Sequence, residues 1–227
     1  MWEDGLRPEL ERILVENLGV EVGKEGWGTS LADLGVDSVA ALELEAIVGQ
    51  RYGVALPAPV VELSSERVLE LISSVSAGKT DNTVSIDAPF DVVWRLTNDV
   101  RGWPDLFTEY AAVEVLGERD DTVRFRLTTV PDEDGSVWSW VSERRSDLAS
   151  RRATAYRVEP GPFTFMQIRW DYAERGPGTE LRWRQAFDVR PEAPFDLGSA
   201  VERIDRTSRQ QMAVIKDKVE AAAAVRS

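Results

Sequence analysis

The sequence predicts two domains: an all-α bundle of four helices, followed by an α+β domain whose antiparallel sheet wraps around a long C-terminal helix. A chain of 227 residues is long enough for two modest domains. Residues 1–78 hold 14 acidic and 5 basic side chains, whereas residues 79–227 hold 26 and 22. All seven Phe and six of the eight Trp lie beyond residue 80. We therefore expect a first domain over 1–78, a flexible linker over 79–82 and a second domain over 83–227.

Helical periodicity predicts the elements of the first domain. Residues 8–18 place their apolar side chains on one helical face. A second helix is expected to begin after Asp37, which has the side chain of a good N-cap, and to end near Gly53. A short helix around 58–63 and a last helix capped by Ser64 or the next residue complete the bundle.

Alternation of apolar and polar residues predicts the sheet of the second domain. A short strand at 83–87 and a helix at 89–98 come first, and one long helix runs from Phe195 to about residue 224. Turn signals separate the remaining strands, which are expected at 110–119, 122–130, 136–146, 152–159, 163–174 and 179–190. A curved sheet that grips a helix encloses a cavity between the two.

The composition excludes several kinds of chemistry. The chain has no Cys and no His, which removes thiolate nucleophiles, disulfides, zinc–thiolate sites and histidine relays. We expect no metal site. The net charge of −13 argues against nucleic acid as a partner. No apolar run approaches the roughly 18 residues of a membrane span. We expect no membrane association and a soluble, cytoplasmic protein that works through Asp, Glu, Arg, Lys, Tyr, Ser or water.

The first domain contains one motif that points to covalent chemistry. Residues 34–39 read LGVDSV and are followed by Leu42-Glu43-Leu44, then by RYGV at 51–54 and Leu56-Pro57. This pattern resembles the acyl carrier protein family of type II polyketide synthases. The resemblance implies a covalent 4′-phosphopantetheine on Ser38, loaded by a phosphopantetheinyl transferase, and a ketosynthase/chain-length factor as partner. A helix N-terminus suits a phosphodiester for physical reasons, although Asp37-Ser38 can also be read as an ordinary helix cap.

The second domain carries a longer set of motifs. They include APF at 88–90, TND at 97–99, WPDLF at 103–107 with Glu109-Tyr110, VW at 137–138 and WVS at 140–142, and PEAPFD at 191–196. The set resembles the single-domain polyketide aromatase/cyclases of the tetracenomycin and spore-pigment type, which have a helix-grip fold of the START/Bet v 1-like superfamily. The resemblance implies that the cavity binds a tethered poly-β-ketone, directs aldol closure of its first ring and removes water to give an arene.

The same resemblance assigns roles to six residues. Arg144 and Tyr110 are the implied catalytic residues, Arg144 as the central polar group and Tyr110 as a proton donor. The implied pocket lining is Trp103, Trp138, Trp140 and Ser142.

Spacing alone supports part of this assignment, because residues 138, 140, 142 and 144 are two apart and share one strand face. Since Arg stays protonated, Arg144 is expected to polarise a ketone, and the base is left open among water, the enolate of the substrate and a carboxylate.

A purely structural role is the alternative for each residue: Trp138 and Trp140 as core residues, Arg144 as a surface ion-pair partner and Tyr110 as a packing residue. The main hypothesis is a carrier fused to a polyketide aromatase/cyclase. Two others remain: a carrier fused to a non-catalytic polyketide- or lipid-binding module, and a fusion in which the second domain mainly recruits the carrier.

Overall fold

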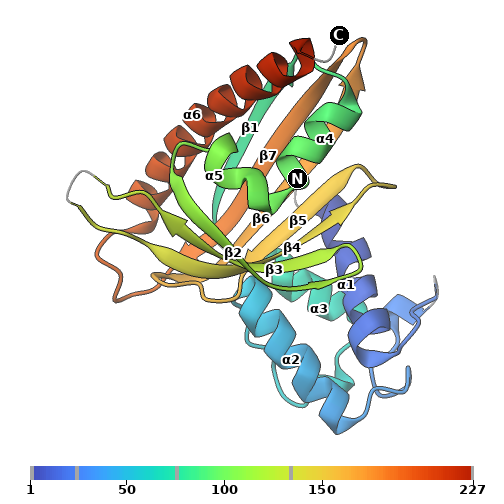
Figure 1. Cartoon of the computed structure of the whole chain (residues 1–227). Helices are drawn as coiled ribbons and strands as arrows, with labels where there is room; N and C mark the ends of the chain where they lie inside the picture. The colour runs from blue at the N-terminus through green and yellow to red at the C-terminus, as the bar shows by residue number, and fades with distance from the viewer. Residues whose placement is uncertain (1–2, 24–25, 75–76, 133–134, 226–227) are drawn as a thin grey trace. The chain divides into compact units, whose positions relative to one another are not determined.

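The computed structural model describes residues 3–23, 26–74, 77–132 and 135–225. The chain folds into two compact units, Met1–Ser76 and Ala77–Ser227 (Figure 1). Within these described ranges, no helix has both the length and the apolar character that crossing a membrane requires.

The first unit is helical, as expected. Its elements are α1 (Glu3–Leu18), α2 (Ser38–Tyr52) and α3 (Ser65–Ser73), with short 3-10 turns at Gly26–Gly28 and Val60–Glu62. The second of these turns stands where a short helix around 58–63 was predicted. Helix α1 begins earlier than the predicted residue 8. Leu14, Leu44 and Val68, one from each α-helix, are fully buried in a common core.

Helix α2 is delimited by the residues that the sequence indicated. The Asp37 carboxylate accepts hydrogen bonds from the backbone N–H groups of Val39 and Ala40, both at 2.9 Å. Gly53 ends the helix with φ at 67°, a left-handed conformation that suits glycine. In the same way, Ser64 caps α3 by accepting from the Arg67 N–H group.

The second unit is a seven-stranded antiparallel sheet with one long helix. Its sheet order is β1-β7-β6-β5-β4-β3-β2. The strands are β1 (Gly78–Ile86), β2 (Tyr110–Arg119), β3 (Thr122–Thr129), β4 (Ser139–Asp147), β5 (Arg152–Arg157), β6 (Phe163–Arg175) and β7 (Gly178–Val189). The helices are α4 (Phe90–Asn98), α5 (Trp103–Leu106) and α6 (Leu197–Ala224).

The predicted flexible linker at 79–82 is wrong. These residues form the first half of β1 and pair with β7 in continuous register, from Lys79 opposite Ala186 to Asn82 opposite Trp183. The strand was missed because its buried positions are filled by Gly78, Thr80 and Asn82, which give no apolar alternation.

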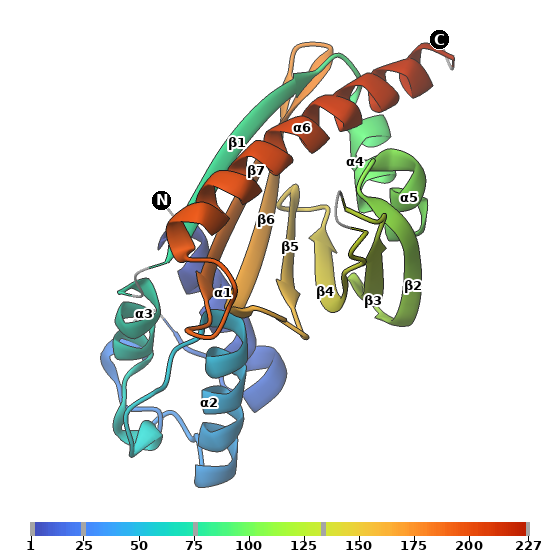
Figure 2. The same ribbon diagram turned by 90° about the vertical axis from the view of Figure 1, so that its left-hand side faces the viewer.

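Helix α6 lies along β1 and β7, and α4 and α5 lie beside its C-terminal half (Figure 2). The close approach to β1 depends on Gly78, where a Cβ would stand 2.7 Å from a methyl group of Val201. Asn82 adds a hydrogen bond of 2.9 Å to Asp205 of the helix. Trp170 of β6 and Ile215 of α6 are fully buried and belong to one core that joins the helix to the sheet.

Candidate functional site

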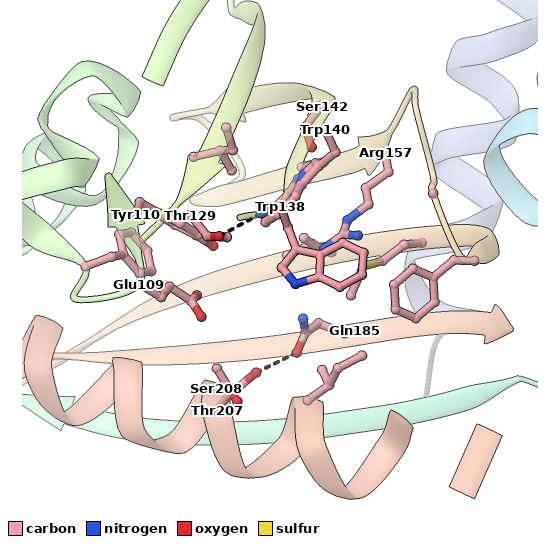
Figure 3. Close-up of a pocket in the computed structure, with 18 of the residues that line it drawn as sticks. Glu109, Tyr110, Thr129, Trp138, Trp140, Ser142, Arg157, Gln185, Thr207 and Ser208 are labelled. Atoms are coloured by element: carbon pink, nitrogen blue, oxygen red, sulfur yellow. Dashed lines mark hydrogen bonds between the residues drawn. The ribbon is translucent and has the colours of Figure 1, made fainter. Parts of the chain in front are cut away.

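The sheet and α6 of the second unit enclose a cavity of about 700 Å³ (Figure 3). Its lining is mainly aromatic and apolar, with a few polar groups at defined places. The fully buried lining residues, such as Phe125 and Trp170, mark its interior. Its exposed lining residues, such as Trp138, Ser199 and Arg203, mark its mouth. The cavity thus has a buried interior and is open to solvent at one end.

All six pocket residues indicated by the sequence line this cavity: Trp103, Tyr110, Trp138, Trp140, Ser142 and Arg144. The surface alternative for Arg144 is therefore wrong, because its side chain is only 2% exposed. Trp138 was expected within a strand at 136–146, but β4 begins one residue after it. Its backbone N–H donates to the hydroxyl of Thr129 at 3.0 Å, and the residue is 46% exposed.

Arg144 is a buried cation held by neutral groups. Its Nη2 donates to Oδ1 of Asn98 at 2.9 Å, and the guanidinium lies 4.5 Å from the ring centroid of Trp170 and 5.4 Å from that of Trp103. No described carboxylate forms an ion pair with it, and among the described residues its Nε has no hydrogen-bond partner. Burial lowers the pKa of Arg144, while nearby Tyr172 opposes that shift.

The neutral groups around Arg144 form a short network that fixes its position. Asn98, the last residue of α4, accepts from Arg144 and from the Ser146 hydroxyl at 2.8 Å. Its amide nitrogen donates to the Tyr172 hydroxyl at 3.2 Å. Thr97 shares a further hydrogen bond of 2.9 Å with Tyr172. Thr97 and Asn98, two neighbouring residues of α4, thus belong to the same network. This network orients the guanidinium without neutralising its charge.

Tyr110 lies on the cavity wall at the start of β2. Its ring stacks on Trp103 at 6.0 Å between centroids and meets the edge of Trp140 at 6.3 Å. Burial, followed by the negative charge of neighbouring Glu109, raises the pKa of Tyr110 well above 10.0. The phenol therefore keeps its proton at neutral pH and can act as a donor.

Glu109 is a carboxylate that the sequence reading did not single out. It lines the cavity beside Tyr110, and Figure 3 shows its side chain turned toward the cavity. Burial raises the pKa of Glu109, although the Tyr110 phenol and the positive charges of Arg157 and Arg203 act in the opposite direction. A carboxylate whose pKa is raised is a stronger base than an ordinary one. The only sequence signal was its place next to Tyr110 in the motif.

Arg157 is a second cation of the cavity that the sequence reading missed. Its guanidinium lies 4.1 Å from the ring centroid of Trp140 and 5.1 Å from that of Phe163. Burial lowers the pKa of Arg157 to about 10, so it stays charged at neutral pH. It is the last residue of β5, and the sequence offered no pattern that pointed it inward.

The opposite wall presents an amide. Gln185 of β7 accepts hydrogen bonds on Oε1 from Ser208 of α6 at 2.7 Å and from Thr80 of β1 at 2.9 Å. With its oxygen occupied in this way, the amide nitrogen remains as a donor on the cavity side, where Figure 3 places Gln185. Guests with several carbonyl oxygens thus meet donors on both walls.

The first unit exposes the predicted attachment residue. Ser38 is the first residue of α2, is exposed and follows the Asp37 cap. Val39 and Leu42 on the same helix are 74% and 66% exposed, and Glu43, the residue after Leu42, is also exposed. The free N–H groups and the positive end of the helix dipole favour a phosphodiester at this place. The residues present therefore fit a phosphopantetheine group on the Ser38 hydroxyl.

Two family profiles match the chain. Residues 8–75 match the family described as phosphopantetheine attachment site, and residues 77–220 match the family described as polyketide cyclase / dehydrase and lipid transport. The sequence resemblances are thereby confirmed for both units.

Curated relatives and a solved structure are similar to the second unit. A putative polyketide cyclase of Streptomyces cyaneus is 50% identical over 144 residues, which are 63% of this chain and 95% of the relative. The granaticin polyketide synthase bifunctional cyclase/dehydratase of Streptomyces violaceoruber is 27% identical over 147 residues, 63% of this chain and 44% of the relative. The Zhui aromatase/cyclase of a Streptomyces species shares the fold, with a TM-score of 0.57 at 24% identity, covering 66% of this chain and 95% of that one.

Proposed function

Because the chain belongs to the polyketide cyclase / dehydrase and lipid transport family and also has a phosphopantetheine attachment domain, we propose that it acts on a poly-β-ketone tethered to that arm. In this proposal, Met1–Ser76 is the carrier and Ala77–Ser227 closes the first ring by an aldol reaction and aromatises it. The curated relatives support the polyketide context, because the granaticin relative is named as a polyketide synthase cyclase/dehydratase.

One observation carries the proposal: the cavity holds a base, an acid and a fixed cation together. Glu109 is a carboxylate with a raised pKa, Tyr110 is a phenol that keeps its proton, and Arg144 is a buried cation without a carboxylate partner among the described residues. A cavity for passive binding of an apolar guest does not need this combination. An aldol closure followed by loss of water needs each of the three.

Ring closure begins with proton removal from carbon. The Glu109 carboxylate takes a proton from a methylene that lies between two carbonyl groups, and the electron pair forms an enolate. The enolate carbon then attacks a ketone carbon further along the chain, whose C=O bond opens to an alkoxide. Arg144 stabilises the oxygen on which negative charge develops, and Tyr110 supplies the proton that makes it a hydroxyl.

Dehydration uses the same groups again. Glu109 gives its proton to the new hydroxyl, which leaves as water, and a proton on the adjacent carbon is lost to the phenolate of Tyr110. The carbon–carbon double bond that forms, together with enolisation of the remaining ketones, gives the aromatic ring. Both residues return to their starting protonation states. The aromatic walls exclude bulk water and favour a flat product over an extended chain.

In the carrier, the Ser38 hydroxyl is the proposed attachment point of 4′-phosphopantetheine. When bound, this group supplies a thiol that holds the polyketide as a thioester. The exposed Val39 and Leu42, with the acidic Glu43, form a mixed apolar and acidic helix face. Such a face suits basic partner enzymes, for which a ketosynthase/chain-length factor and a phosphopantetheinyl transferase are the proposed partners.

A binding module without chemistry is the second candidate. The lipid transport part of the family description and the apolar lining of the cavity favour it. The two functions differ in what they require of Arg144, because a carrier of apolar guests gains nothing from a buried cation.

The test adds the full chain to an aromatic polyketide synthase that assembles a poly-β-ketone and compares the products formed with wild type, Arg144→Lys and Arg144→Ala. The proposal predicts one ring-closed aromatic product with wild type and a scatter of spontaneous products with Arg144→Ala. Arg144→Lys keeps the charge but loses the planar donor set, so it is expected to lie between them. Equal product profiles for all three proteins would favour the binding module.

A further inference from the structure

The side of α6 that faces the cavity mouth carries a polar stripe that the ring-closing chemistry leaves unused. Ser199, Arg203 and Thr207 are four residues apart and all line the cavity. Because an α-helix rises 1.5 Å per residue, this spacing puts the three side chains in a row about 12 Å long. Figure 3 shows Thr207 on this side of the helix, next to Ser208.

Arg203 is the central member of the stripe and an exposed, unused cation. It makes no hydrogen bond or ion pair with any described residue, although other Arg side chains of α6 do, such as Arg209 with Asp205. Glu109 lies near enough to feel its charge but does not form an ion pair with it. An unpaired guanidinium flanked by two hydroxyl groups is a suitable donor set for a phosphate.

The position of the stripe matters as much as its chemistry. Arg203 and Ser199 are exposed lining residues, whereas Arg144 and Trp170 at the other end of the cavity are buried. A phosphopantetheine arm has its phosphodiester at one end and the thioester at the other. When the thioester and its ketones lie inside, the phosphodiester lies toward the mouth, where this stripe is found.

We propose that Ser199, Arg203 and Thr207 form a binding site for the phosphodiester of the phosphopantetheine arm, which holds the tethered substrate in the cavity. This inference rests on the proposed function, since it assumes that the guest arrives on such an arm. Two acidic groups lie near the stripe. Asp196 accepts from the Ser199 N–H group at 2.8 Å and from the Ser199 hydroxyl at 3.3 Å, so the phosphate competes with Asp196 for that hydroxyl. The negative charge of Glu109 is offset by the positive charges of Arg157 and Arg203.

The site gives a measurable preference for phosphate. Contacts to an exposed guanidinium are modest, so we expect the phosphodiester to improve binding by about three- to tenfold at low salt. Screening by salt reduces this preference.

The test compares two stable ligands that carry the same flat aromatic group through an amide: one on pantetheine, the other on the methyl phosphodiester of 4′-phosphopantetheine. Calorimetric titration measures the Kd of each for the full chain with Ser38→Ala, which has no arm of its own. The Ser38→Ala protein is expected to bind the phosphodiester ligand more tightly than the pantetheine ligand. With Arg203→Gln added, the two ligands are expected to bind equally well, and with Arg203→Lys part of the preference is expected to remain. Arg206→Gln is the matched control, because Arg206 is exposed on the same helix but does not line the cavity.

The outcomes separate the two claims. If both ligands bind the Ser38→Ala protein equally well, the phosphodiester site is refuted and the proposed function stands. If neither ligand binds, both claims fall. A preference that survives Arg203→Gln but not Arg206→Gln would also overturn the assignment. Repeating the titration with Ser38 loaded identifies the source of the natural phosphodiester: weaker binding of the phosphodiester ligand means that the chain's own arm competes, and unchanged binding assigns the site to a separate carrier.

Discussion

Replacing Glu109 by Gln tests whether this carboxylate is the base that starts ring closure. The substitution keeps the shape of the side chain and removes its negative charge. Burial raises the pKa of Glu109 above the ordinary 4.5, which makes the carboxylate a better base for a carbon acid. Positioned general bases contribute about 10²- to 10⁴-fold to rate, so we expect the rate of ring closure to fall by about that factor.

The pH dependence follows from the same shift. Wild-type kcat/KM falls at acid pH as Glu109 takes up a proton, with a midpoint above 4.5, whereas Glu109→Gln loses this limb. The free energy of unfolding has the opposite pH dependence and falls as Glu109 ionises. A raised pKa means that the folded state binds more protons than the unfolded state, so ionised Glu109 lowers stability once pH rises through that window. Glu109→Gln is therefore expected to be as stable as wild type at neutral pH, or more stable by up to about 1 kcal/mol.

The assay measures disappearance of a linear poly-β-ketone thioester and formation of the aromatic product between pH 4 and pH 9, and thermal unfolding is measured beside it. Glu114→Gln is the matched control, because Glu114 is an exposed carboxylate on β2, the strand that begins one residue after Glu109. A folded Glu109→Gln protein with wild-type rate and the same acid limb would refute the role of Glu109 as base.

Three further predictions concern other parts of the chain. Arg144→Met removes a buried cation along with one hydrogen bond to Asn98 and stacking on Trp170. The free energy of unfolding is therefore expected to change by no more than about 2 kcal/mol, while the rate of ring closure falls about 10²- to 10³-fold. Retained activity in a folded Arg144→Met protein would contradict the proposed role. Three arginines that donate hydrogen bonds lower the pKa of Asp171 to about 2, so its stabilisation is complete above 3.8 and is lost as pH falls toward 2. Asp171→Asn is expected to lose about 1–2 kcal/mol at pH 7 and less at pH 3, measured by denaturant unfolding, and an equal loss at both pH values would count against this account. Ser38→Ala is expected to gain no mass when incubated with coenzyme A and a phosphopantetheinyl transferase, whereas wild type gains one phosphopantetheine; modification of the variant would place the attachment elsewhere.

Local patterns predicted those features that depend on neighbouring residues. Asp37 caps α2 because a carboxylate before a helix accepts its free N–H groups, and Gly53 ends that helix because it adopts a left-handed conformation. The spacing of two between Trp140, Ser142 and Arg144 put all three on the inner face of β4, as expected.

The features that were missed depend on contacts between distant segments. Asn98 orients Arg144 across 46 residues of sequence, and no local pattern indicates that contact. Arg157 reaches the cavity because β5 ends there, and Arg203 because α6 crosses the mouth. The first half of β1, residues 79–82, was predicted as a linker because Thr80 and Asn82 bury polar side chains that are paired only in the folded sheet, with Gln185 and Asp205.

The proposed function is tested most directly by following one poly-β-ketone chain on the protein itself. Ser38 is loaded with phosphopantetheine, a synthase transfers the nascent chain to it, and intact-protein mass spectrometry follows the tethered cargo during a single turnover. The account predicts that the cargo becomes lighter by one water as one aromatic ring forms, and that cargo on the Arg144→Ala, Glu109→Gln double variant keeps its mass on that time scale. Equal rates of water loss from the wild type and the double variant would contradict it.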